Sequence, residues 1–130
     1  MASGTPDGGR PADPEAALFR RLLQERMERA HAQIGRLDAE IREVTLARRD
    51  TPADDEHDPE GSTVSIERER DVVLLAGAEA QRSELRAAAA RLAAGTFGIC
   101  ERCGRPIPRG RLEARPEVRF CVPCVSQGAR

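Results

Sequence analysis

The first half of the chain carries apolar residues at alternating steps of four and three positions. This spacing places them on one face of an α-helix and is typical of a coiled-coil seam. Asp13 and Pro14 supply a helix start, because Asp accepts a hydrogen bond as N-cap and Pro is tolerated in the first turn. Pro52 disfavours helix at the preceding residue, so the helix is predicted to end near Asp50. Its seam consists of Leu23, Met27, Ala30, Ile34, Leu37, Ile41 and Val44.

A second helix is predicted from a cap at Ser62 or Thr63 to Ala94, because Gly95 is a good terminating residue. Two stripes compete for its packing face. One contains Leu75, Ala78, Leu85, Ala89 and Leu92, with Arg82 interrupting it. The other contains Ile66, Val73, Ala76, Ala80, Ala87 and Ala90. We favour the Leu-containing stripe, because its side chains fill the space opposite the Leu and Ile of the first helix. The connection is short, so the two helices must pack antiparallel.

The chain is poor in core-forming residues. Leu, Ile, Val and Phe make up about a fifth of its 130 residues, and Trp and Tyr are absent. The formal net charge of −1 is nevertheless too small for the composition typical of a disordered protein. Paired helices and a bound metal are therefore expected to compensate for the small core. No run of about 18 apolar residues occurs, so no membrane span is predicted.

The four cysteines occur as two Cys-x-x-Cys pairs, Cys100 with Cys103 and Cys121 with Cys124, separated by seventeen residues. This spacing predicts one zinc ion held by four thiolates. Four protein ligands leave no position for water or substrate, which indicates a structural zinc. Two disulfides are the alternative, and they would require an oxidising compartment. We expect the reducing cytoplasm, because the N-terminus has no apolar signal-peptide segment.

Together these patterns predict a mainly α protein: a long antiparallel helical hairpin followed by a small C-terminal four-cysteine zinc finger. We expect a disordered leader over residues 1–13, the hairpin over 14–95 with its tip loop near 51–61, the zinc finger over 96–125 and a tail over 126–130. A small apolar cluster is expected over the metal, formed by Phe97, Ile99, Ile107, Leu112, Val118 and Phe120.

Charge is distributed unevenly along the chain. Residues 50–60 hold six acids and no base, whereas residues 96–130 hold seven Arg against three Glu. We predict a partner-binding tip formed by Asp54, Asp55, Asp58 and Glu60, with a plain solvated turn as the alternative. The Arg-rich segment is able to contact DNA phosphates, or Arg111 and Arg115 brace the hairpin base through Glu residues.

The sequence contains no pattern that predicts a catalytic site. His57 is expected to be a solvent-facing loop residue rather than a metal ligand beside Asp55 and Asp58, and His31 falls outside the apolar seam. The chain shows no Ser/His/Asp set and no glycine-rich phosphate loop. We therefore predict no enzyme and no catalytic residue.

Several runs around the cysteines resemble one family. The runs are GTFGICERCG at residues 95–104, IP at 107–108, RLEARP at 111–116 and FCVPC at 120–124. They resemble the DksA/TraR zinc-finger proteins, whose coiled coil also matches the predicted hairpin. The resemblance implies a bacterial transcription regulator that binds RNA polymerase and inserts its hairpin into the secondary channel. Acidic tip residues then lie near the catalytic Mg²⁺ and alter initiation, in some members together with ppGpp.

The chain departs from this family at the tip and in the second helix. Well-studied members carry Asp-x-x-Asp-x-Ala at the tip. Asp55 and Asp58 keep the Asp spacing, but Glu60 stands in the Ala position. Alignment on Asp58-Pro59 instead places Gly61 at the second Asp. ppGpp remains an open partner, disfavoured by Glu79 and Glu84 in the second helix and by Val125 after the last Cys.

Two other classes of protein fit the same residues. One is a DNA-binding zinc ribbon, and the other is a coiled-coil adaptor in which zinc is purely structural. Salt-dependent retention on DNA would favour the ribbon, and failure to bind both DNA and polymerase would favour the adaptor. We expect a monomer in the cytoplasm, bound to RNA polymerase, with no sequence-specific DNA contact and no membrane contact.

Overall fold

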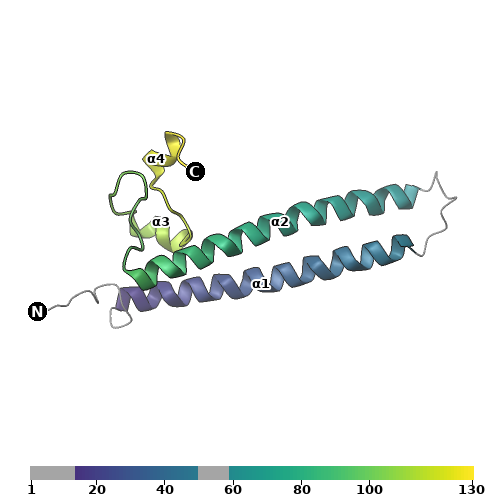
Figure 1. Ribbon diagram of the computed structural model, residues 1–130, viewed down its shortest axis with the longest axis horizontal. Helices are drawn as coiled ribbons and strands as arrows, with labels where there is room; N and C mark the ends of the chain where they lie inside the picture. Colours follow the sequence, from purple (N-terminus) through teal and green to yellow (C-terminus); the bar gives the residue numbers. More distant parts are fainter. Residues whose placement is uncertain (1–13, 50–58) are drawn as a thin grey trace, which may run out of the picture. The chain divides into compact units, whose positions relative to one another are not determined.

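The computed structural model describes residues 14–49 and 59–130 and is mainly helical (Figure 1). Helix α1 spans Pro14–Arg49 and helix α2 spans Pro59–Ala94. Two short helices follow, α3 over Arg109–Ala114 and α4 over Val122–Ser126. Among the residues described, no helix combines the length and apolar character needed to cross a membrane.

Over the described residues, the chain divides into two compact units, one of residues 14–28 and 82–130, the other of residues 29–49 and 59–81. In the first unit, the start of α1 lies beside the end of α2, and the zinc module follows (Figure 1). The buried apolar residues that the two helices contribute there are Ala16, Phe19, Leu23, Leu85, Ala88 and Leu92. Leu85 and Ala88 have no exposed surface. The zinc module packs against this apolar layer, where the ring of Phe97 contacts the ring of Phe19.

In the second unit, the end of α1 lies beside the start of α2. Ile34 and Leu37 of α1 form a core with Ala78 of α2, and Leu75 packs against it. Polar groups join the helices further along, where Arg68 Nε donates to Thr45 Oγ1 over 3.2 Å. Because the facing residues run in opposite order along the two helices, the pair is antiparallel, as predicted.

The predicted seam of α1 is confirmed. Ala30, Ile34 and Leu37 are buried, and Ile41 and Val44 are half-buried further along the same face. Ala16 and Phe19 extend the buried face toward the N-terminus, beyond the predicted seam. His31 is exposed, as its position outside the seam predicts.

The Leu-containing stripe of α2 is also confirmed, with one correction. Ile66 and Val73, from the competing stripe, are 66% and 70% exposed. The residue packed after Leu85 is Ala88, whereas Ala89 is exposed. A helix has 3.6 residues per turn, so a step of three and a step of four both keep the same face, and the partner helix selects between them. Asp71, which belongs to neither predicted stripe, is also buried.

The ends of α2 differ in how well they were predicted. The helix begins at Pro59 rather than after a cap at Ser62 or Thr63, which is consistent with the tolerance for Pro in a first turn. At the other end Gly95 adopts φ +83°, which L-residues rarely adopt. The amide of Thr96 donates to the Arg91 carbonyl (2.9 Å) and the amide of Gly95 to the Leu92 carbonyl (3.2 Å). This Schellman pattern ends the helix and turns the chain into the zinc module.

Candidate metal centre and its supports

The zinc module brings its four cysteines together. Their sulfur atoms all lie within 4.8 Å of one another, and Cys103 Sγ is 3.8 Å from Cys121 Sγ. Four sulfurs about 2.3 Å from a zinc ion, at the corners of a tetrahedron, are about 3.8 Å apart. A disulfide would need about 2.05 Å, and the four thiols are free. The sulfurs are therefore positioned to bind one metal ion, and the disulfide alternative does not fit.

Each Cys-x-x-Cys pair forms a tight turn, which we call a knuckle. In the first knuckle, residues 100–103, the Gly104 amide donates to the Cys100 carbonyl (2.9 Å), and Gly104 has φ +75°. In the second knuckle, residues 121–124, Cys121 is the N-cap of α4 and Cys124 lies within that helix. Arg102 joins the knuckles by donating to the Cys124 carbonyl over 3.3 Å. The local turns thus fix the two sulfur pairs before any metal contact is considered.

The thiols differ in how readily they ionise. Burial opposes the ionisation of Cys100, but backbone N–H groups of Cys103, Cys121 and Arg102 outweigh burial and lower the pKa of Cys100 to about 6. One of these is the Cys121 amide, 3.4 Å from Cys100 Sγ. The side-chain hydrogen bond with Cys121, followed by burial, raises the pKa of Cys124 to about 12. With its pKa raised in this way, the Cys124 thiol ionises only beside a cation, and a bound Zn²⁺ would supply that charge.

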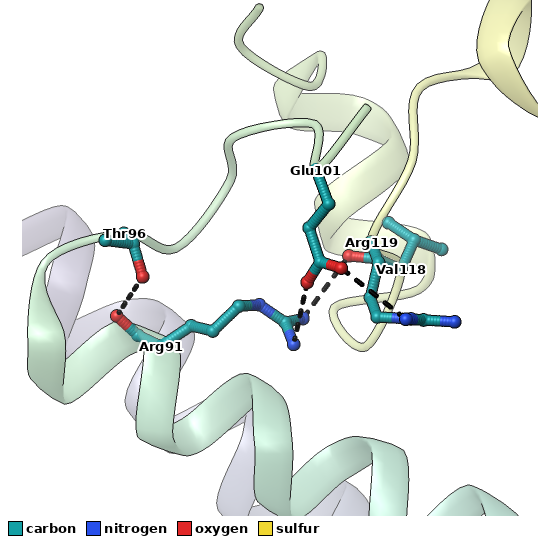
Figure 2. A network of polar contacts seen from close by, with 5 residues as sticks. All are labelled: Arg91, Thr96, Glu101, Val118 and Arg119. Atoms are coloured by element: carbon teal, nitrogen blue, oxygen red, sulfur yellow. Dashed lines mark hydrogen bonds and ion pairs between the residues drawn. The ribbon is translucent and has the colours of Figure 1, made fainter. Parts of the chain in front are cut away.

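Arg91, in the last turn of α2, connects the helix to both halves of the module (Figure 2). Its guanidinium lies 3.8 Å from the carboxylate of Glu101 in the first knuckle and donates to the Val118 carbonyl over 3.5 Å. Arg119 approaches the other oxygen of Glu101 at 3.5 Å. The backbone carbonyl of Arg91 also accepts from the Thr96 hydroxyl, 3.4 Å away. This network holds the first knuckle and the approach to the second against the same helix end.

The expected role of the other arginines needs correction. Arg111 Nε donates to the Phe120 carbonyl (3.1 Å), and Arg115 pairs with Glu117 (3.5 Å), so both act inside the module. The links to the long helices come from Arg91, from Arg26, whose guanidinium donates to the Ala114 carbonyl over 2.8 Å, and from Arg109 of α3, which lies 3.5 Å from Glu15 of α1. The sequence carries no signal for Arg26 or Arg91, because neither lies in a motif.

Glu101 and Glu117 were not predicted as supports. The sequence does give a signal for Glu101, because this residue lies between Cys100 and Cys103 of a predicted metal-binding pair. Glu117 is 4% exposed, and among the described residues its Oε1 atom has no hydrogen-bond partner. A buried carboxylate with one partner is costly, and the guanidinium of Arg115 offsets part of that cost.

The apolar cluster predicted over the metal is only partly formed. Ile107 and Leu112 are buried, and Phe97, Val118 and Phe120 are half-buried. Ile99 is 42% exposed, so it was wrongly placed in the cluster. An antiparallel bridge between Ile99 and Pro106 holds its backbone.

The predicted tip lies largely outside the described residues. Asp54, Asp55, His57 and Asp58 are not described, and Glu60 falls in the first turn of α2, where only the backbone is described. Asp13, the predicted N-cap of the first helix, is also outside the described residues. The role of the tip acids therefore stays a prediction.

Comparison with known proteins bears out the resemblance of the zinc module. Residues 95–125 match the family described as the prokaryotic dksA/traR C4-type zinc finger. An uncharacterized protein of Aquifex aeolicus is 53% identical over 36 residues, which are 28% of this chain and 25% of that protein. The uncharacterized protein YbiI of Escherichia coli is 60% identical over 25 residues, which are 19% of this chain and 28% of YbiI. The matched segments thus span about a quarter of each curated relative.

The fold is shared over almost the whole chain. The structure of transcription factor DksA2 from Pseudomonas aeruginosa superposes with a TM-score of 0.75 and 23% sequence identity. The match covers 96% of this chain and 89% of DksA2. The chain therefore has the fold of DksA2, with a DksA/TraR-type zinc finger at its C-terminal end.

Proposed function

We propose that this protein is a cytoplasmic transcription regulator that binds bacterial RNA polymerase and modulates initiation. The observation that carries the proposal is the fold match with transcription factor DksA2, which covers 96% of this chain. The zinc-finger match at residues 95–125 supports it independently, because it rests on sequence rather than on shape.

In this proposal the metal has a structural task. Cys100, Cys103, Cys121 and Cys124 hold one Zn²⁺, which closes the two knuckles into one module. Zinc supplies folding free energy and no catalytic position, since all four ligands come from the protein. The module then forms the base of the hairpin. Its contacts with Arg26 and Arg91 stabilise the first part of α1 and the last turn of α2.

The tip supplies the regulatory action. In the sequence, Asp54, Asp55 and Asp58 lie between the two long helices, and Glu60 follows in the first turn of α2. We propose that the hairpin enters the secondary channel and that these acids act on the catalytic Mg²⁺ region. Carboxylates close to a divalent cation interact strongly with it even without a dedicated hydrogen bond. Binding and action should then separate, because the base and helices provide affinity while the tip changes initiation.

A DNA-binding ribbon receives less support. Several module arginines contact groups of the protein itself, including Arg111, Arg115 and Arg119. Guanidiniums held in this way are poorly placed to follow a phosphate backbone.

The test replaces the tip acids without removing their shape. In the variant Asp55→Asn/Asp58→Asn we expect nearly unchanged retention of polymerase in a pull-down, but no effect on transcription from several promoters. The matched control is Glu79→Gln/Glu84→Gln, which neutralises two exposed acids of α2 and should preserve both activities. A wild-type protein that fails to retain polymerase would contradict the proposed function. A tip variant that still modulates initiation would refute the role of the tip. The proposal that the protein binds polymerase would stand.

A further inference from the structure

A mainly apolar pocket of about 260 Å³ opens in the first compact unit, and none of the four cysteines lines it. The start of α1, the last turn of α2 and the first residues of the zinc module each contribute to it. Its apolar walls are formed by Ala16, Phe19, Leu92, Phe97, Ile99 and Leu112.

The walls are held by contacts that do not depend on an occupant. The rings of Phe19 and Phe97 are 5.1 Å apart and tilted by 46°, a favourable aromatic arrangement. The Gly98 carbonyl accepts from the Ile107 amide over 2.7 Å. A Cβ atom on Gly98 would lie 3.2 Å from Leu112 Cδ1, so this glycine allows the loop to approach α3 closely. The pocket is therefore preformed, which lowers the entropic cost of filling it.

The size of the pocket favours a single side chain. Pockets for whole small molecules usually enclose about 300–1,000 Å³, and this one is smaller. Ile99, which lines it, leaves 42% of its surface exposed. An exposed branched apolar residue beside a preformed apolar hollow is a feature of protein-binding surfaces, where one buried anchor carries much of the affinity.

The charges beside the pocket indicate which type of partner residue would lie next to the inserted apolar side chain. Glu15 lines the pocket, and Arg109 lies 3.5 Å from it and 2.9 Å from Glu113. Two carboxylates thus accompany one guanidinium, and all three side chains are about half exposed. Among the described residues, these ion pairs hold two acids and one base, whereas residues 96–130 as a whole hold seven Arg and three Glu. A basic group on the partner would complement the second of these acids.

We propose that this pocket receives one bulky apolar side chain of a protein partner, with an adjacent Lys or Arg of that partner paired to Glu15 and Glu113. The inference rests on the proposed function in one respect, which is that the partner is RNA polymerase. The pocket then anchors the base of the protein on the polymerase surface, separately from the acidic tip.

Direct occupancy is tested with dipeptides on the full, zinc-loaded chain. Amide chemical shifts of Gly98 and Ile99 are followed by NMR during titration with acetyl-Phe-Arg-amide. Saturable shifts centred on these amides are expected, with binding at least about threefold weaker for acetyl-Phe-Asp-amide and acetyl-Ala-Arg-amide. Absence of saturable shifts there, or equal binding of the three dipeptides, would overturn the assigned chemistry.

The polymerase as occupant is tested with a matched pair of variants. Ile99→Glu places a charge at the pocket, whereas Val122→Glu places the same charge on α4 at a valine that is 54% exposed and does not line the pocket. Ile99→Glu should weaken polymerase binding by about tenfold or more, the scale of a lost anchor. Val122→Glu should leave binding within about twofold of wild type.

The outcomes separate the two proposals. Wild-type binding with equal retention of both variants would refute the pocket as the polymerase contact while preserving the proposed function. Failure of the wild type to bind polymerase would refute the proposed function and this occupant together. The dipeptide titration then still decides whether the pocket takes an apolar side chain beside a basic one.

Discussion

Replacement of Cys100 by Ser gives the most direct test of how the zinc module is stabilised. Cys100 is 1% exposed, and its sulfur accepts the Cys121 amide at 3.4 Å. A serine hydroxyl stays protonated where the thiol ionises readily, so one of four ligands is lost. Structural zinc sites contribute about 10–16 kcal/mol, and a quarter of that is about 2.5–4 kcal/mol. Such a loss corresponds to a zinc affinity lower by about 100- to 1,000-fold.

The consequence should extend beyond the metal. The first knuckle holds Glu101, which pairs with Arg91 of α2 at 3.8 Å. When zinc no longer closes the module, this contact is lost, and the last turn of α2 should exchange its amide hydrogens faster. The helices themselves should persist, because the core around Ile34, Leu37 and Ala78 lies in the other compact unit.

Zinc affinity is measured by competition with a chromophoric chelator, and the local effect by hydrogen exchange resolved to single amides. Wild-type protein stripped of zinc by EDTA is the control and should match the Cys100→Ser variant in its exchange pattern. A variant with wild-type zinc affinity, or a metal-free wild type with unchanged protection of the module, would show that zinc does not stabilise this part of the chain.

Two further predictions concern packing, both measured by urea unfolding followed by circular dichroism on zinc-loaded protein. Leu85→Ala should lower the free energy of unfolding by about 2–5 kcal/mol, because Leu85 is fully buried. Val73→Ala, at a 70% exposed position of the same helix, should change it by less than about 0.5 kcal/mol, and equal effects would contradict the assigned seam. Gly98→Ala should cost about 1–3 kcal/mol, since φ is +83° and its Cβ would lie 3.2 Å from Leu112 Cδ1. An unchanged midpoint would mean that the loop readjusts without strain.

The main elements could be predicted from the sequence, because each depends on the chemistry of a few neighbouring residues. The spacing of Ile34 and Leu37 predicted a helix face because side chains on a helix repeat every 3.6 residues. Gly95 predicted a helix end because only glycine adopts a positive φ at little cost. The two Cys-x-x-Cys pairs predicted a metal-binding cluster because two tight turns suffice to supply four sulfurs. Each of these properties depends on a few neighbouring residues.

Other features depended on which surfaces meet in space. Ala88 and Ala89 are chemically identical, so only the position of α1 decides which of them is buried. Ile99 is apolar in sequence yet 42% exposed, and only the folded module shows how little of its side chain the neighbouring residues cover.

The sequence by itself determined the helices and the four-sulfur cluster, through periodicity, turn chemistry and ligand spacing. The tertiary structure alone decided how the module is attached and where its surface is hollow. The link between Arg91 and Glu101 joins residues ten apart across a chain reversal, and the pocket combines Phe19 with Phe97. Long-range pairs of this kind have no local signal, because their energy comes from contacts that exist only after the chain has folded.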